Sequence, residues 1–95
     1  MVNTLEFLDF HNGAGTYRPR GKHSLVEAVD LISRAIALCR DRDVNTLLID
    51  ATGFVDLPMP TLVDRFLMVE AWAHAARGTV IVVMVVSPAF IHPRK

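Results

Sequence analysis

Two short apolar segments indicate where the core of this chain lies. One ends in an acid at Asp50, and the other contains seven consecutive apolar residues. Short apolar runs without alternation are typical of strands buried on both faces, as in a parallel sheet covered by helices. The pattern predicts parallel strands over Thr46–Asp50 and Thr79–Val86. We expect Val82 or Val83 to be fully buried.

The amino-terminal third reads as a β-hairpin. Asn12-Gly13 separates two apolar segments, and both residues tolerate the positive φ that a tight hairpin turn requires. We therefore expect antiparallel strands over Thr4–Phe10 and Ala14–Arg18, with the second strand also parallel to the two later ones. The basic residues that follow suggest a solvated turn or, alternatively, an anion-facing patch: Arg18, Arg20, Lys22 and His23.

A first helix is predicted from Ser24 to between Arg40 and Asp43. Ser24 and Glu27 form a capping box, in which each side chain satisfies a backbone donor at the helix start. Apolar residues then recur at helical spacing. Cys39 falls on this apolar stripe, so we expect it to be a buried small hydrophobic residue and not a nucleophile.

A second helix follows a loop over residues 51–59. Either Thr61 and Asp64 form another capping box, or Pro60 occupies the first helical position. Met68 and Trp72 lie off the predicted inner stripe, where they either cover the edge of the core or form an exposed patch that binds a partner. The predicted inner stripe consists of Leu62, Phe66, Val69, Ala73 and Ala76.

The resulting order is β-β-α-β-α-β, an α/β fold with a small, mixed, mostly parallel sheet in a single domain over residues 1–95. Together with the segment from Leu48 to Gly53, this order resembles the STAS fold of the bacterial anti-sigma-factor antagonists. In that family a serine at the start of the next helix is phosphorylated. The corresponding position here offers only the hydroxyl of Thr61, so we expect no such switch. The family also continues with a third helix and usually another strand.

Composition excludes several classes of function. Ten basic and ten acidic residues among 95 give no net charge, which argues against nucleic acid or an anionic membrane as partner. The longest apolar run is far shorter than the roughly 20 residues of a membrane helix. The single cysteine and four histidines show no metal-ligand spacing. We expect a cytoplasmic protein without metal or cofactor, and not an enzyme.

The leading functional hypothesis is a non-catalytic regulatory or protein-interaction module of STAS type, with a homodimer as the expected assembly. It would act through the loop after Asp50 and the start of the second helix. The alternative is a carrier for an apolar or anionic small molecule held between helices and sheet. A third interpretation is that the acids cap loop amides and Thr61 caps the helix, without a ligand. The candidate binding residues are Asp50, Thr52, Gly53, Asp56, Thr61 and Trp72.

Overall fold

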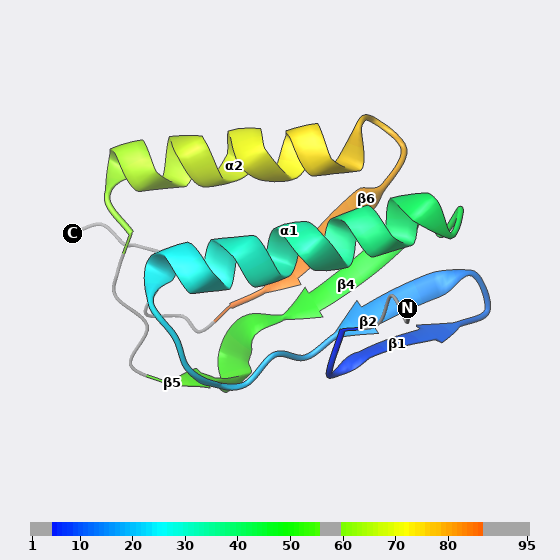
Figure 1. The fold of residues 1–95 in the computed structure, drawn as a ribbon, viewed down its shortest axis with the longest axis horizontal. Coiled ribbons are helices and arrows are strands. Elements are labelled where there is room, and N and C mark those ends of the chain that lie inside the picture. Colours follow the sequence, from blue (N-terminus) through cyan, green and yellow to red (C-terminus); the bar gives the residue numbers. More distant parts are fainter. Residues whose placement is uncertain (1–4, 56–59, 87–95) are drawn as a thin grey trace.

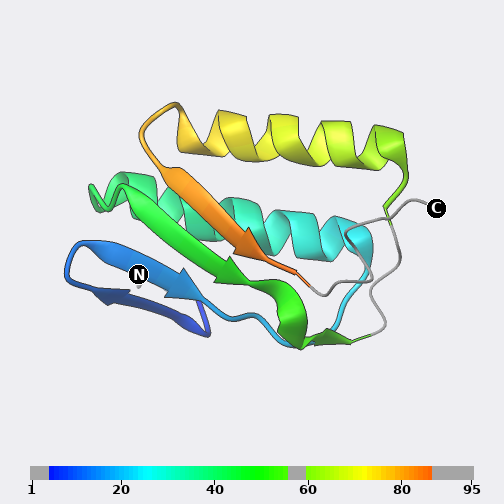
Figure 2. The same cartoon turned by 180° about the vertical axis from the view of Figure 1, so that it is seen from behind.

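The computed structural model describes residues 5–55 and 60–86. A four-stranded sheet carries both helices on one side (Figures 1 and 2). The elements along the chain are β1 (Leu8–His11), β2 (Ala14–Tyr17), β3 (Gly21–Lys22), α1 (Leu25–Asp41), β4 (Thr46–Asp50), the 3-10 helix η1 (Ala51–Gly53), β5 (Phe54–Val55), α2 (Leu62–Ala76) and β6 (Ile81–Val85).

The sheet has the order β1-β2-β4-β6, which confirms the predicted fold class. β1 and β2 are antiparallel, whereas β2, β4 and β6 run parallel; Thr46 pairs with Ala14 on one side and with Ile81 on the other. Asn12 and Gly13 have φ of 52° and 79°, as the hairpin turn requires. The first strand is shorter than predicted and begins at Leu8, after a positive φ of 69° at Phe7.

The core lies between α1 and the helix-facing side of the sheet. Leu47 and Ile49 in β4 and Cys39 in α1 are completely buried. Burial raises the pKa of the Cys39 thiol, in keeping with its predicted role as a core residue. The Ser24–Glu27 capping box at the start of α1 is also confirmed.

The prediction that both faces of the sheet are buried is wrong. Because both helices lie on one face, no element of the described residues covers the other face, and Leu48 in β4 is only half-buried (Figure 2). β6 is moreover an edge strand, so Val83 on the open face is 49% exposed, and Val82 is half-buried. The expectation of a fully buried Val82 or Val83 therefore fails. A continuous apolar run does not distinguish a central strand from an edge strand.

The predicted inner stripe of α2 is also wrong in most of its positions. Leu62, Phe66 and Val69 are 83%, 63% and 62% exposed, and only Ala76 is buried. α2 packs on α1, and β6 is the last strand of the described sheet, so β6 lies beneath only part of the stripe (Figure 1). We call Leu62, Phe66, Val69, Ala73 and Ala76 the apolar stripe of α2.

Two long-range hydrogen bonds tie α2 to α1. The Trp72 indole donates Nε1–H to the backbone oxygen of Val29 at 3.4 Å. Three residues further along α2, the backbone oxygen of Ala75 accepts a hydrogen bond from Arg40 Nη1 at 2.7 Å. Trp72 therefore packs against the core, which agrees with the first of the two placements that the sequence left open for it, at the edge of the core.

Candidate functional site

The loop after β4 is organised by a hydrogen-bonded pair. Asp50 Oδ1 accepts from the Thr52 hydroxyl at 2.6 Å and from the Thr52 backbone N–H at 3.1 Å. These two bonds, the hydroxyl first, lower the pKa of Asp50 below its ordinary value of 3.8, because both donors stabilise the charged carboxylate. This geometry corresponds to an acid that caps a loop amide. Asp50 and Thr52 thus lie together as predicted, but the hydroxyl and backbone N–H of Thr52 both donate to the Asp50 carboxylate.

The pair gives a direct pH prediction. Replacing Thr52 with Ala removes the hydroxyl donor, so the pKa of Asp50 should rise toward 3.8. Since the folded pKa is depressed, this bond contributes to stability above the unfolded pKa, and the contribution is lost as pH falls through the folded value. NMR titration of the Asp50 carboxyl carbon measures the shift. Equal pKa values in the wild type and Thr52→Ala would contradict the assignment.

Gly53 has a steric role in the same loop. A Cβ at this position would lie 2.6 Å from the backbone oxygen of Pro19, closer than any side chain tolerates. The close approach aligns β5 with β3 in a two-stranded parallel sheet, with Gly21 opposite Phe54. Sequence analysis missed this small sheet, since two-residue strands carry no periodic signal.

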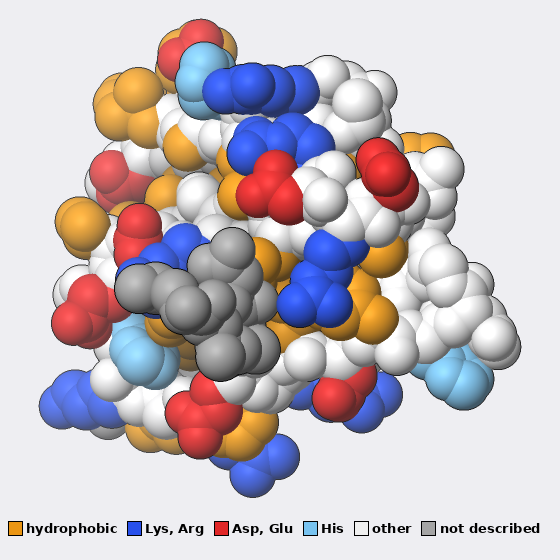
Figure 3. Space-filling view, turned by 45° about the vertical axis from the view of Figure 1, so that its right-hand side comes forward, with side chains coloured by type: hydrophobic (Ala, Val, Ile, Leu, Met, Phe, Trp, Pro, Cys, Tyr) orange, Lys and Arg blue, Asp and Glu red, His pale blue; other side chains and the backbone are white. Residues whose placement is uncertain are grey.

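The basic segment before α1 packs against aromatic rings. The Arg20 guanidinium lies 5.0 Å from the centre of the Phe7 ring, a cation–π arrangement. The His23 ring meets Phe54 edge-to-face at 5.6 Å between centroids. On the face shown in Figure 3, acidic and basic side chains are interspersed. These contacts favour the interpretation of a turn that anchors the loop.

Thr61 caps α2. Its hydroxyl accepts from the Asp64 backbone N–H at 3.0 Å, and Asp64 Oδ2 accepts from the Thr61 N–H at 2.9 Å. The capping box therefore holds, and Pro60 lies before the helix. Asp56, the remaining acid of the predicted site, lies outside the described residues.

Loss of this cap should be measurable. Thr61→Ala leaves the Asp64 amide without its side-chain acceptor, so we expect a loss of about 0.5–2 kcal/mol in unfolding free energy. Urea denaturation gives the value, with Thr61→Ser as a control that restores the hydroxyl. A Thr61→Ala chain as stable as wild type would show that the cap contributes nothing to the free energy of unfolding.

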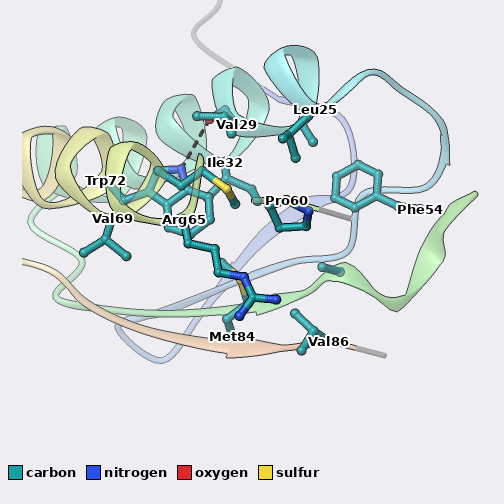
Figure 4. A pocket seen from close by; sticks show the side chains of 13 residues that line it. Leu25, Val29, Ile32, Phe54, Pro60, Arg65, Val69, Trp72, Met84 and Val86 are labelled. Carbon is teal, nitrogen blue, oxygen red and sulfur yellow. Dashed lines mark hydrogen bonds between the residues drawn. The ribbon is translucent and has the colours of Figure 1, made fainter. Parts of the chain in front are cut away.

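An apolar pocket of ≈ 290 Å³ lies between the two helices and the carboxyl end of the parallel strands (Figure 4). Most of its lining is aliphatic or aromatic, and the Arg65 side chain adds the one charged group among the described residues that line it. The Trp72 indole forms part of the wall through its bond to Val29. The lining residues are Leu25, Ala28, Val29, Ile32, Ala51, Phe54, Pro60, Arg65, Met68, Val69, Trp72, Met84 and Val86.

Sequence analysis placed a ligand between helices and sheet but did not identify this lining. Met68 and Trp72, the two residues off the predicted stripe of α2, were the available signal. Within the described part of the chain, no three His, Cys, Asp or Glu side chains are grouped as a metal site would require. No described helix is long and apolar enough to cross a membrane.

The more extensive feature is the uncovered surface of α2. Five large apolar side chains on this helix are between 55% and 83% exposed: Leu62, Val63, Phe66, Leu67 and Val69. A contiguous apolar surface rimmed by polar residues commonly marks an interaction site. This apolar surface begins at the first turn of α2, which is also the point where the sequence predicted one end of the interaction surface.

Comparison with protein-family models, curated proteins and solved structures gives no match to this chain.

Proposed function

We propose that this chain is a non-catalytic protein-interaction module that binds its partner through the exposed surface of α2. The observation that carries the proposal is the set of five large apolar side chains on one helix, exposed by 55% or more. Burying such side chains favours association by about 25 cal/mol per Å² of apolar surface. A helix whose apolar side chains dock into a partner's groove is a common recognition element.

The loop after β4 has a supporting part in this proposal. The Asp50–Thr52 pair and the close packing of Gly53 fix the β4 end of the connection toward α2. The element order, with its resemblance to the STAS fold, further supports a regulatory module of that kind. Because Thr61 and Asp64 engage each other in the cap, we propose that phosphorylation at Thr61 does not control binding.

The test uses two variants matched in exposure. Phe66→Glu places a charge on the apolar surface, whereas Val26→Glu places one on α1, where Val26 is 79% exposed. We expect proteins captured by the wild type from its own host to be captured by Val26→Glu and lost with Phe66→Glu. Purified partner and calorimetry then give the affinity change. Capture that is insensitive to Phe66→Glu would refute the proposal.

Self-association belongs to the same proposal, since a second copy is the simplest partner. Light scattering at high micromolar concentration should show a dimer that Phe66→Glu or Leu67→Glu weakens and Val26→Glu does not. A monomer throughout would remove the homodimer and leave a different protein as the partner.

The pocket supports a second candidate, a small-molecule carrier. Its volume of ≈ 290 Å³ is close to the lower end of ligand sites, about 300 Å³, and its lining is apolar. Native mass spectrometry of the chain purified from its host distinguishes the two candidates. A retained apolar molecule that is lost on Ala28→Phe, which fills the pocket, would favour the carrier.

A further inference from the structure

The sheet ends at β6 with an edge that has no polar protection. β6 reads Ile81-Val82-Val83-Met84-Val85, without charge, glycine or proline. The opposite edge strand, β1, carries Asp9 and His11 among its four residues. Charged side chains are a usual way to keep an edge strand from pairing with another chain. Of the two edges of the described four-stranded sheet, only the β6 edge lacks them.

The backbone of β6 offers hydrogen bonds on this open edge. Ile81 donates its N–H to the backbone oxygen of Asn45, on the β4 side. Backbone groups alternate in direction along a strand, so those of Ile81, Val83 and Val85 point toward β4. Val82 and Met84 therefore direct their N–H and C=O groups to the open edge.

Beside this edge lies an apolar groove of ≈ 330 Å³ between α2 and β6. Val69 and Ala73 of the apolar stripe form one side, and Val82 and Met84 of β6 form another. The sequence pattern of the stripe is that of a buried helix face, yet the described sheet passes beneath only part of it. The groove is lined by Val69, Trp72, Ala73, Ala76, Val80, Val82 and Met84.

We propose that β6 accepts a further strand from a partner protein, an extended segment with apolar residues at every second position. This inference rests on the proposed function and names the form of the partner. Backbone bonds to Val82 and Met84 would hold the segment, and its alternate side chains would fill the groove beneath the stripe. The added strand gives the stripe of α2 the sheet that it lacks.

The occupant of the β6 edge is a bare strand and not the β6 edge of a second copy, which would meet this chain at the surface of α2 instead. β2, β4 and β6 all carry helices on the same face (Figures 1 and 2). A second copy that paired antiparallel through its own β6 edge would carry its helices on the same face, where its α2 would compete with this α2 for the space above the groove. A charged segment is disfavoured as well, because the groove lining has no counter-charge among its described residues.

A displayed peptide library tests the proposal. The peptides have about 5–6 residues, the usual length of a strand, and alternate positions are randomised among Val, Ile, Leu and Phe. We expect bound peptides to protect the Val82 and Met84 amides from hydrogen exchange. N-methylation along one edge of a bound peptide should weaken its binding about fivefold for each backbone bond lost, because such a bond is worth about 1 kcal/mol. N-methylation along the other edge should have little effect.

Met84→Pro provides the matched change in the protein. Proline removes an N–H that faces the open edge and is tolerated at such edge positions. It should abolish peptide binding while the unfolding transition remains cooperative; if the variant does not fold, the N-methylated peptides decide alone. No enriched peptide, or binding that N-methylation along either edge leaves unchanged, overturns the strand.

Protection of Val82 and Met84 in the free chain would also overturn the proposal, because the edge would already be covered by residues 87–95 or by a second copy. Failure of strand addition is distinguishable from failure of the interaction module. If only strand addition fails, capture of host proteins still depends on Phe66. If the interaction module itself fails, capture no longer depends on Phe66.

Discussion

Ile49→Ala should lower the unfolding free energy by about 2–5 kcal/mol, the range for large-to-small changes in a core. Ile49 is completely buried on the helix-facing side of β4, between β2 and β6. Removing its side chain loses the transfer energy of the deleted carbons and leaves a cavity between three elements that cannot all move inward. Urea denaturation with a fitted two-state transition gives the value.

Leu48→Ala is the matched control. Leu48 is the neighbouring residue on β4, but it points to the open face of the sheet and is half-buried. Its truncation should therefore cost less than that of Ile49, on the order of 1 kcal/mol. Equal costs at the two positions, or a cost below about 1 kcal/mol at Ile49, would contradict a sheet with one covered face.

Trp72→Ala should be the second large effect, about 2–4 kcal/mol, somewhat below the loss for a completely buried tryptophan. The indole is half-buried, packs against the core and bonds to the Val29 carbonyl. It links α2 to α1 through this bond, and Ala76 is the only fully buried residue in α2. Its loss should release α2 before the rest of the domain unfolds.

Trp72→Phe separates the ring from the hydrogen bond. Phenylalanine keeps most of the packed surface and loses only the N–H donor, so we expect a cost of about 0.5–1.5 kcal/mol. Hydrogen exchange of the α2 amides should be faster in Trp72→Ala and nearly unchanged in Trp72→Phe. If neither variant affects α2, then Arg40 and its bond to Ala75 hold the helix instead.

Local chemistry was predictable from the sequence, and three-dimensional burial was less so. Asn12-Gly13 and the two capping boxes are short-range features whose geometry depends on a few adjacent residues, and all three are present. The parallel order of β2, β4 and β6 follows from helices placed between apolar strands. The edge position of β6 could not be read from its composition, because an unbroken apolar run occurs both in central strands and in edge strands.

The candidate site shows the same division. Asp50 and Thr52 do lie together at the end of β4, but their mutual hydrogen bonds could be seen only in the structure. The stripe from Leu62 to Ala76 has the periodicity of a buried face, and the structure leaves most of it exposed. The predicted stripe placed Trp72 off the inner face of α2, and the sequence left open whether it covers the core edge or is exposed. Packing of α2 on α1 selects a different face.

The central claim is that the surface of α2 is uncovered in the isolated chain and covered in the cell. Thiol labelling measures this directly, since Cys39 is buried and the chain has no other cysteine. Phe66→Cys and Val26→Cys should label at similar rates in purified protein at low concentration, where the chain is monomeric. In cells of the native host, we predict that the cysteine at position 66 becomes protected while the one at position 26 stays reactive. Equal labelling of both positions in the cell, or slow labelling of position 66 in the purified chain, would contradict the claim.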